Sequence, residues 1–345
     1  NKPRIKCSDC ANKDYAILDS AAIDKHLRGK AVYGIYSLLP DETCCFLAMD
    51  FDDEGWQKDI STLRDICVKK NIPIAIERSQ SGNGAHAWFF FSDRISASSA
   101  RKFGTLLLTN AMTERHEIKF SSYDRLFPNQ DTLPKGGFGN LIALPLQANA
   151  RKNDNSVFID ENFQPYDDQW SFLSNIRILS DEDIDKYISQ LGGSNELGDL
   201  RQSEDEDIHP WERKKLDSKL NTDNLPDTVY ITKANMLYIS KKGFSNKALN
   251  SLKRMAAFRN PDFYKAQAMR LPTYDKPRII SLSDETPDYL CLPRGCEPDL
   301  VNMLSTLKAD IEWVDATCSG RTVDVGFNGQ LREEQTDAAD SMLEY

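Results

Sequence analysis

An apolar run that ends in closely spaced carboxylates, Leu47-Ala-Met-Asp-Phe-Asp-Asp53, restricts most how this chain can fold. A short apolar run of this kind is typical of a buried strand. Side chains two apart in a strand point to the same face, so Asp50 and Asp52 are predicted to stand side by side, with Phe51 turned into the core. Neighbouring carboxylates repel each other unless a positive charge lies between them. A divalent cation would satisfy them, because Mg²⁺ is commonly bound by one or two carboxylates together with substrate phosphates.

A second interpretation of these acids needs no site. Acidic residues at a strand end also occur in solvated turns and at helix N-termini. Asp53 precedes an amphipathic helix predicted to begin near Trp56, and its side chain is a candidate N-cap. The rest of the N-terminal half decides between the two interpretations.

Length and composition define the class of protein. The chain has 345 residues, of which 40% are hydrophobic and 28% charged. This composition predicts an ordinary globular protein of two or three domains. An apolar run of about 18 residues and a secretory signal are both missing, so we expect a cytoplasmic protein with no membrane partner. Because the sequence starts at Asn1 and stops soon after an amphipathic helix, we expect a fragment cut at both ends.

The net charge of -10 argues against binding nucleic acid over the whole surface, because phosphate contacts need Lys and Arg. The acids are concentrated, however, in Ser180–Asp185, in Glu204–Asp207 and near the C-terminus. Basic pairs such as Arg101-Lys102 and Arg151-Lys152 lie elsewhere. Each pair is typical of a solvated face, and together they leave room for a local basic groove.

Eight scattered cysteines, several of them in apolar runs, indicate a reducing compartment rather than a disulfide framework. Cys7-Ser-Asp-Cys10 is the exception, because a Cys-x-x-Cys pair is half of a zinc site. The other half would be Cys44 and Cys45, or cysteines upstream of Asn1. Two ordinary thiols in a loop are an equally open interpretation.

The order of predicted elements indicates an α+β fold. Helices are predicted from Trp56, from a Ser96 or Ser98 cap to about Arg115, and from Ser180 to Leu191. The resulting order is strand, helix, strand, strand, helix, strand, which predicts a mixed or antiparallel RNA-recognition-like sheet with helices on one face. The predicted strands are 31–39, 45–51, 72–76, 87–91, 118–123 and 141–146.

The polar, acidic stretch from Gly192 to about Asn224 predicts a linker. We therefore expect a first domain over 1–195, a linker over 196–224 and a smaller α/β accessory region over 225–345. That region has a predicted strand at 229–231, a helix at 247–258 and a last helix from Glu333.

The segment from Glu77 to Trp88 places two glycines, Gly82 and Gly84, and several serines between two predicted strands. Glycine lets backbone N–H groups approach an anion and a hydroxyl such as that of Ser81 adds a donor, so this composition suits a phosphate. His86 opens the next strand and can donate to a phosphate oxygen. A flexible hairpin with an incidental histidine is the alternative.

A third polar segment follows the predicted strand 118–123. Asp124 closes that strand as Asp50 closes the earlier one, and a third carboxylate would complete a two-metal site. Lys135 then precedes another Gly-rich turn. Phe127-Pro128, between them, is also consistent with a simple buried anchor for the loop.

These three segments together carry a resemblance. Asp-x-Asp at a strand end, a Ser-and-Gly loop ending in His, and a later hydrophobic-Asp are the three motifs of the archaeo-eukaryotic primase superfamily. The words Ile76–His86, Asp124–Asp131 and Gly137–Leu146 are similar to those of the primase domain of TOTE conflict systems. The resemblance covers roughly Asn1 to Leu191. Those defence-like prokaryotic proteins fuse such a primase to a superfamily 2 helicase and often to a nuclease.

The resemblance implies a DNA primase-polymerase that joins nucleotides on a single-stranded DNA template, with a primer and (d)NTPs as partners. Carried over by position, Asp50, Asp52 and Asp124 would be catalytic and would hold two Mg²⁺ or Mn²⁺ ions, with Asp131 the rival third ligand. One metal would lower the pKa of the attacking 3′-hydroxyl and the other would steady the leaving pyrophosphate.

The resemblance also assigns the nucleotide site. His86 and Ser81 would hold the incoming triphosphate with the backbone amides near Gly82 and Gly84. Further candidates for contacts to nucleotide or template are Arg125, Gln130 and Lys135. The pair Cys7 and Cys10 is similar to the family's N-terminal zinc knuckle, but this chain lacks a complete ligand set.

Near the C-terminus, the segment Leu331–Ala338 is similar to the adenine-reading motif just upstream of the P-loop in superfamily 2 helicases. Its Gln335 could pair with an adenine edge, although an exposed Gln on an ordinary amphipathic helix is the alternative. The chain contains no Gly-x-x-x-x-Gly-Lys-Ser/Thr, so we do not expect it to hydrolyse ATP as a helicase. The helicase motor, and a nuclease where one is fused, would be partners outside this fragment.

Two functions of other classes compete with the primase hypothesis. The first is a non-catalytic module of a helicase that binds nucleic acid or a nucleotide; its weakness is that three acids beside a phosphate would repel it. The second is a metal-dependent nuclease that uses the same acids. The loop from Ser81 to His86 argues against a nuclease, which need not hold a triphosphate.

Overall fold

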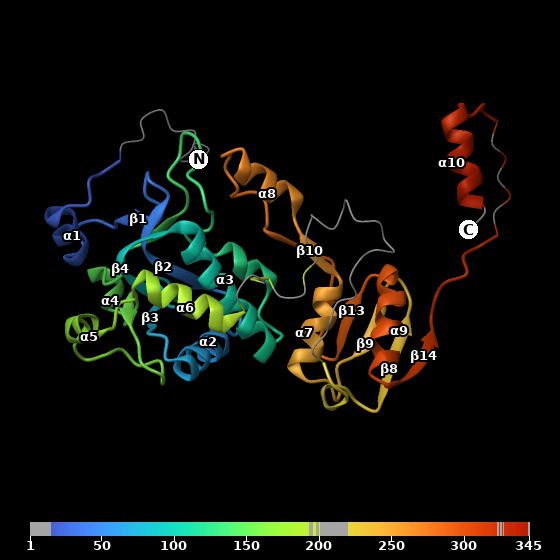
Figure 1. Cartoon of the computed structure of the whole chain (residues 1–345), viewed down its shortest axis with the longest axis horizontal. Coiled ribbons are helices and arrows are strands. Elements are labelled where there is room, and N and C mark those ends of the chain that lie inside the picture. Colours follow the sequence, from blue (N-terminus) through green and yellow to red (C-terminus); the bar gives the residue numbers. More distant parts are fainter. Residues whose placement is uncertain are drawn as a thin grey trace.

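The computed structural model describes residues 15–192, 196–197, 200, 220–322, 324, 326 and 328–343. In these residues the chain folds into two five-stranded sheets and two small two-stranded ribbons, with helices packed on the sheets (Figure 1). The predicted α+β class is therefore confirmed. Cys7 and Cys10 lie outside the described residues.

The first sheet has the order β5-β2-β4-β3-β7, and each neighbouring pair is antiparallel. Because β2 and β3 are both antiparallel to β4, they run parallel to each other, and α2 (Trp56–Lys70) connects them. This is a split β-α-β arrangement with β4 inserted in the middle. The strands are β2 (Thr43–Phe51), β3 (Ala75–Arg78), β4 (Ala85–Ser96), β5 (Leu126–Phe127) and β7 (Val157–Phe158).

Helices α2, α3 (Ala97–Glu114) and α6 (Asp181–Leu191) pack together with this sheet. Gly104 of α3 touches β2 so closely that a Cβ there would lie 2.9 Å from Leu47 and 3.2 Å from Met49. Leu47 and Met49 of β2 therefore face the helices. As predicted, Ser96 caps α3 by accepting the Ser99 amide at 3.1 Å, and a capping box opens α6.

The even-numbered residues of β2 from Phe46 onward, and the residues of β4 opposite them, face the other way. Phe46, Trp88 and Phe90 form a row on this second face, with ring centroids 5.3 Å and 6.2 Å apart. Asp50 and His86 continue the alternation at the ends of the same strands. The polar ends of β2 and β4 thus share a face that the helices do not cover.

Smaller elements complete the N-terminal half. Strand β1 (Gly34–Tyr36) pairs antiparallel with β6 (Leu141–Ala143). The helices here are α1 (Ser20–Leu27), α4 (Ala148–Arg151) and α5 (Gln169–Asn175).

The second sheet has the order β12-β13-β9-β8-β14, in which β14 and β8 are parallel. Helices α7 (Asn246–Met255) and α9 (Glu297–Thr306) supply buried leucines to its core. Helix α10 (Glu333–Leu343) follows this sheet in the chain. The strands are β8 (Thr228–Lys233), β9 (Leu237–Ser240), β12 (Asp284–Glu285), β13 (Tyr289–Leu292) and β14 (Asp310–Asp315).

One segment of the C-terminal half packs on the first core. Strands β10 (Ala257–Arg259) and β11 (Ile279–Ser281) form an antiparallel ribbon that flanks α8 (Pro261–Ala268). Ala257 and Ile279 belong to the hydrophobic core of the first sheet, not to that of the second. Residues 257–281 therefore bind the first unit, although they follow the predicted boundary at 225.

The strand predicted over 118–123 is wrong. Residues Phe120–Asp124 form a 3-10 helix, η2, so Asp124 ends a helical turn rather than a strand. Side chains three apart lie above one another in such a helix. Phe120 and Tyr123 are both buried and their rings stack at 6.5 Å, which favours this turn over an alternating strand.

Several other boundaries also differ from the prediction, among them the strand predicted over 31–39, which spans only Gly34–Tyr36. Asp53 does not cap α2, because the N-cap is Gly55 with no side-chain bond. The strand predicted over 141–146 stops at Ala143. The helix predicted over 247–258 stops at Met255, because Ala257 begins to pair with β11.

In the part of the chain that the structure describes, every helix is too short or too polar to cross a membrane. Cys44 is buried and Cys45 is exposed, and both are free thiols. Burial raises the pKa of Cys44 to about 12.

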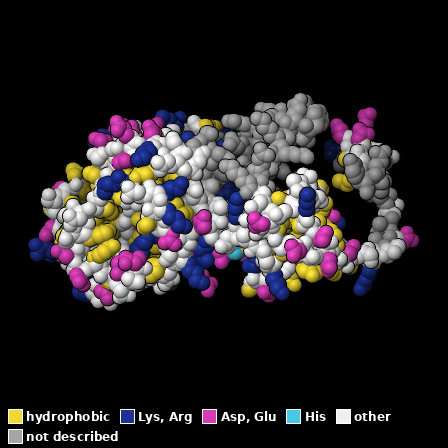
Figure 2. Space-filling view, turned by 60° about the horizontal axis from the view of Figure 1, so that its bottom comes forward, with side chains coloured by type: hydrophobic (Ala, Val, Ile, Leu, Met, Phe, Trp, Pro, Cys, Tyr) yellow, Lys and Arg dark blue, Asp and Glu magenta, His cyan; other side chains and the backbone are white. Residues whose placement is uncertain are grey.

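The face in Figure 2 has Lys and Arg side chains interspersed with Asp and Glu over both units. The net charge of -10 is thus not a uniform acidic surface. Basic side chains are locally available on the larger unit.

Candidate active site at the end of the first sheet

Asp50, Asp52 and His86 form what we call the strand-end cluster. Asp50 on β2 lies opposite His86 on β4 in the sheet register, and His86 Nε2 is 3.7 Å from Asp50 Oδ1. Asp52 follows directly after the last residue of β2. The Asp50 and Asp52 side chains are 27% and 55% exposed, so a ligand from solvent can reach both.

The β3–β4 loop lies directly on the end of β2. Its ends are closed by a bond from the Ser79 amide to the Gly84 carbonyl at 2.9 Å, and Ser81 Oγ accepts the Asn83 amide at 3.2 Å. A Cβ on Gly84 would stand 2.5 Å from the Phe51 carbonyl oxygen. Only glycine allows this approach, which brings the predicted phosphate loop against the Asp-x-Asp segment.

Gly82 occupies the left-handed region, with φ of +81°, where a side chain is unfavourable. A Cβ there would also stand 2.7 Å from Asn155 Oδ1, so residue 155 braces the loop from the other side. The two glycines singled out in the sequence therefore have separate structural requirements. Gly84 permits contact with β2, and Gly82 permits the turn.

Glu77 is a residue of this site that the sequence analysis missed. Its side chain on β3 is 2% exposed and accepts bonds from His86 Nδ1 at 2.9 Å, Trp88 Nε1 at 2.9 Å and Ser156 Oγ at 3.2 Å. An acid within the apolar run around Ile76 was the available signal, since buried acids are rare unless paired. The indole N–H of Trp88 also needed a partner.

His86 is held between two acids. Burial of the ring opposes its protonation, but the hydrogen bond and charge of Glu77, with a contribution from Asp50, raise the pKa of His86 above its ordinary value. The protonated ring would therefore persist to higher pH than a free histidine and would favour an anion near Nε2.

Arg125 is brought to the cluster as well. Its guanidinium contacts Asp52 and lies 3.7 Å from Asp53, whose carboxylate is also 3.4 Å from Lys119. The Arg125 carbonyl accepts the Asp50 amide at 3.0 Å. The chain thus partly balances the strand-end carboxylates with its own cations.

The backbone of Asp124 lies next to the strand-end cluster, but its side chain bonds elsewhere. It immediately precedes Arg125, yet its Oδ1 accepts the backbone N–H of Arg278 at 2.7 Å. Burial raises the pKa of Asp124, and the Arg278 N–H partly offsets this. The rival acid Asp131 lies elsewhere, paired with Arg101.

The remaining predicted residues are not gathered at the cluster. Gln130 is 4% exposed, and both ends of its amide are paired, Nε2 with the Thr132 carbonyl at 2.7 Å and Oε1 with the Thr273 hydroxyl at 2.9 Å. Lys135 is exposed, and its amide bonds the Arg270 carbonyl at 2.9 Å. Gln335 is exposed on α10.

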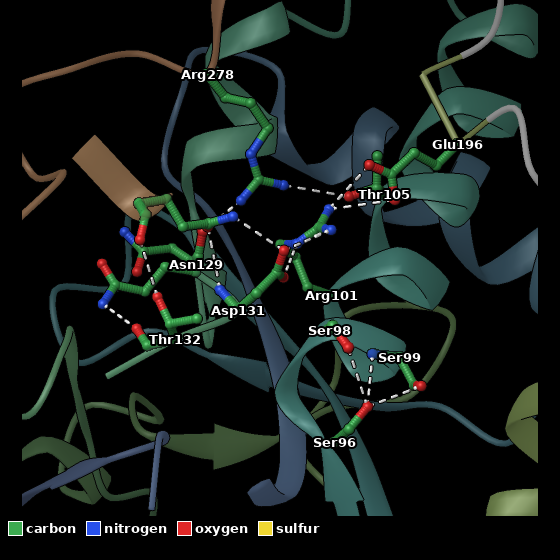
Figure 3. A network of polar contacts seen from close by, with 12 residues as sticks. Ser96, Ser98, Ser99, Arg101, Thr105, Asn129, Asp131, Thr132, Glu196 and Arg278 are labelled. Carbon is green, nitrogen blue, oxygen red and sulfur yellow. Dashed lines mark hydrogen bonds and ion pairs between the residues drawn. The ribbon is translucent and has the colours of Figure 1, made fainter. Parts of the chain in front are cut away.

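A second polar cluster lies between the first core and the 257–281 segment. We call Arg101, Asp131, Glu196 and Arg278 the arginine network (Figure 3). Arg101 contacts both oxygens of Asp131, one of them at 3.1 Å, and lies 3.2 Å from Glu196. Arg278, 1% exposed, donates to the Asn129 carbonyl. Sequence reasoning missed it because its members are far apart in the chain.

Two residues of the strand-end cluster, Asp50 and Asp52, are suited to bind a divalent cation. Among the described residues, no three His, Cys, Asp or Glu side chains are arranged to hold a metal ion. Asp50 and Asp52 nevertheless offer the carboxylate oxygens that Mg²⁺ prefers, and its remaining positions are commonly filled by phosphates and water. Asp124 does not join them in the arrangement seen here.

Comparison of the sequence with known families identifies a primase-type nucleotidyltransferase domain. The family model for the archaeo-eukaryotic primase domain of TOTE conflict systems matches residues 1–187, and the chain belongs to this family. The predicted resemblance is thereby confirmed for the primase. None of the curated proteins matches the chain.

Proposed function

We propose that this chain is a DNA primase-polymerase, which joins nucleotides on a single-stranded DNA template. One observation supports this most: the Gly84 loop packs on the end of β2, where His86 faces Asp50 across the sheet. A loop suited to phosphate and a pair of carboxylates suited to a divalent ion thus meet at one point. Phosphoryl transfer needs both.

In this proposal Asp50 and Asp52 hold Mg²⁺ or Mn²⁺, and Asp124 is the third candidate ligand. When bound, the divalent ions would lower the pKa of the 3′-hydroxyl and stabilise the leaving pyrophosphate. The contact of Arg125 with Asp52 partly offsets the repulsion between the carboxylates in the free protein.

The triphosphate would be held by His86, the Ser81 hydroxyl and the amides near Gly82 and Gly84. Two carboxylates beside it would repel it unless a cation neutralises them, so nucleotide and divalent ion should bind together. Arg125 is close enough to the cluster to add a contact to the nucleotide. Lys135, which is exposed, stays a weaker candidate for a template contact, whereas Gln130 is buried with both ends of its amide paired.

The wider context follows the family. We propose that a primer, a DNA template and nucleoside triphosphates are the partners, and that Gln335 belongs to the adenine-reading motif of a helicase motor. A zinc site at Cys7 and Cys10 is part of the same proposal.

The decisive experiment is synthesis on labelled single-stranded DNA, with and without a primer, in Mg²⁺ or Mn²⁺. Asp50→Asn/Asp52→Asn should abolish synthesis. Asp53→Asn is the matched control, because it removes the next carboxylate along the chain but lies outside the motif, and it should keep most of the activity.

The other functions would give different products. Shortened DNA that depends on Asp50 and Asp52 would indicate the nuclease. DNA or nucleotide binding without synthesis by the wild type would indicate a binding module, and either result would overturn the polymerase proposal.

A further inference from the structure

Glu77 is a charged side chain at the centre of a buried sheet. It is 2% exposed, and it lies between His86 of β4 on one side and Phe158 of β7 on the other. A carboxylate in such a place is costly unless several donors satisfy it. Three donors from β4 and the 156 region do so, at 2.9, 2.9 and 3.2 Å.

The donors have a definite order. One oxygen, Oε2, accepts both His86 Nδ1 and Trp88 Nε1, and the other accepts the Ser156 hydroxyl. His86 and Trp88 lie two apart on β4, so they share a face, and their rings meet edge to face at 6.2 Å. The imidazole is therefore fixed by Glu77 on one side and by Trp88 on another.

Fixing Nδ1 determines where the other nitrogen points. When one ring nitrogen of histidine is tied by a hydrogen bond, its orientation and its free nitrogen are set. Here Nε2 is directed toward Asp50, at 3.7 Å from Oδ1, on the face where Asp52 and the Gly84 loop meet. Without Glu77 the ring could turn Nε2 away from that point.

We propose that Glu77 is a positioning residue, which holds His86 so that Nε2 faces the incoming triphosphate. This inference rests on the proposed function and deepens it by naming the group that orients the histidine. Glu77 touches neither nucleotide nor metal and acts only through His86. Partners that orient a metal-ligating histidine in this way are typically worth about 10-fold to 100-fold in metal affinity or activity, and we expect a comparable effect for a histidine that faces a phosphate.

The test compares Glu77→Gln with Glu77→Asp in the full chain. Gln keeps the length, so its carbonyl can accept from His86 and Trp88 while its NH₂ donates to Ser156; the ring stays in place, and we expect the loss of the Glu77 charge alone to raise the KM for dNTP clearly less than Glu77→Asp does. Asp is one methylene shorter and draws back from the ring. We expect it to raise the KM about tenfold or more, with kcat little changed, as for lost uniform binding.

A double-mutant comparison separates positioning from packing. If Glu77 acts through His86, Glu77→Asp should raise the KM in the wild-type background and leave it unchanged in a His86→Ala background. Equal losses in both backgrounds would overturn the proposal, because they would indicate a general structural role. Ser156→Ala is the control, since it removes a partner of Glu77 that does not touch His86, and its KM should stay near wild type.

A spectroscopic signal makes the test independent of polymerase activity. The chain has 4 histidines, so the ring Nδ1–H of His86 can be assigned in ¹⁵N spectra by its loss in His86→Ala. We expect a protected signal in wild type and Glu77→Gln and its loss in Glu77→Asp. Its absence in wild type would overturn the proposal. A protected signal in a protein that makes no DNA would support the hold of Glu77 on the ring and would overturn only the proposed function.

Discussion

The strand-end cluster and the arginine network are both groups of charges on the first unit, but they are built differently. In the network, Arg101 is 9% exposed and bonded to two carboxylates. In the cluster, Asp52 is 55% exposed, and Asp50 meets His86 only at 3.7 Å. Charges that serve folding are neutralised within the chain, whereas charges that serve chemistry are left where a substrate can replace their partners.

One short segment of chain contributes to both. Asp124 ends η2 beside the strand-end cluster, and Asp131 lies in the network. Both are acids with part-buried side chains, and both contact the 257–281 segment, through Arg278 and Gln267. Substituting each acid with its amide therefore tests whether the difference between the clusters is real.

The largest effect is expected for Asp124→Asn. If Asp124 is a metal ligand, synthesis should fall at least about 1,000-fold, which corresponds to about 4 kcal/mol. Asn Oδ1 can still accept the Arg278 N–H. The free energy of unfolding should therefore change by less than about 1 kcal/mol. Primer extension and urea unfolding of the same preparation measure the two quantities.

Near-normal synthesis by Asp124→Asn would show that Asp50 and Asp52 act without a third acid from η2. A large loss of stability would instead place Asp124 with the arginine network. Either result would contradict the distinction between the two acids, in which Asp124 serves catalysis and Asp131 serves stability.

The next effect is expected for Asp131→Asn, which should lower the free energy of unfolding by about 3 kcal/mol, because removing one partner leaves a buried charge incompletely neutralised. That charge is Arg101. Burial would raise the pKa of Asp131, but the charge and hydrogen bonds of Arg101 hold it below its ordinary value, so the ionised form is the one that stabilises the fold. Denaturant unfolding at neutral pH measures this loss.

The exposed pair of Arg94 and Asp41 is the control for Asp131→Asn. Its side chains are 66% and 50% exposed. Because exposed pairs contribute little, Arg94→Ala should change stability by less than about 1 kcal/mol. Equal effects of the two substitutions would contradict the structural role of the network. Protein that stays folded after Asp131→Asn should retain its specific activity.

The sequence predicted those parts of the fold whose signals are local. The spacing of Trp56, Ile60 and Leu63 and the caps at Ser96 and Ser180 each specify one helix without reference to the rest of the chain. The Asp-x-Asp strand and the Gly loop were likewise readable, because side-chain alternation and glycine content act over a few residues.

What the sequence did not predict depends on contacts between distant residues. Glu77 lies opposite His86 only because β3 pairs with β4 in one register. Arg278 reaches Asp124 across 154 positions of the chain, which no local pattern encodes. The strand predicted over 118–123 failed because burial of Phe120 and Tyr123 on one side favoured a 3-10 turn over alternation.

A smaller effect is expected for Gly84→Ala, which tests whether the strand-end cluster depends on the loop. The new Cβ would stand 2.5 Å from the Phe51 carbonyl oxygen, so the loop must move away from Asp52. We expect synthesis to fall about tenfold to 100-fold, because small misplacements of binding groups have effects of this size. The measurement is kcat/KM for dNTP.

Gly295→Ala is the matched control for Gly84→Ala, since a Cβ at Gly295 meets nothing within 4 Å. It should leave synthesis unchanged. Full activity of Gly84→Ala would mean that the loop need not touch β2, and it would weaken the juxtaposition on which the proposed function depends.

The smallest effect is expected at a third cluster, intermediate in exposure, where Glu285 joins the two units. Its side chain is 23% exposed and bonds His116 and Lys241, both at 2.9 Å, and Lys253 at 3.2 Å. Burial would raise the pKa of Glu285, but these partners hold it well below its ordinary value of 4.5. Because the folded-state pKa is depressed, this stabilisation is complete above about pH 4.5 and is lost as the pH falls further.

Glu285→Gln should therefore lower the free energy of unfolding by about 1.5 kcal/mol near pH 6, the scale of a hydrogen bond to a charged group. The gap between wild type and variant should narrow as the pH falls below about 4.5, because only the wild type loses the ionised carboxylate.

The control for Glu285→Gln is Glu297→Gln, which removes the 2.7 Å pair with Lys233. That pair is more exposed, so its loss should lower the free energy of unfolding by less than Glu285→Gln does. The difference in free energy of unfolding between wild type and Glu285→Gln could also stay constant as the pH falls well below the ordinary pKa of a glutamate. That result would mean that the charge of Glu285 does not hold the two units together. The buried charge of Glu285 would then not stabilise the fold. The comparison between stabilising and solvent-accessible charges would rest on the arginine network and the strand-end cluster alone.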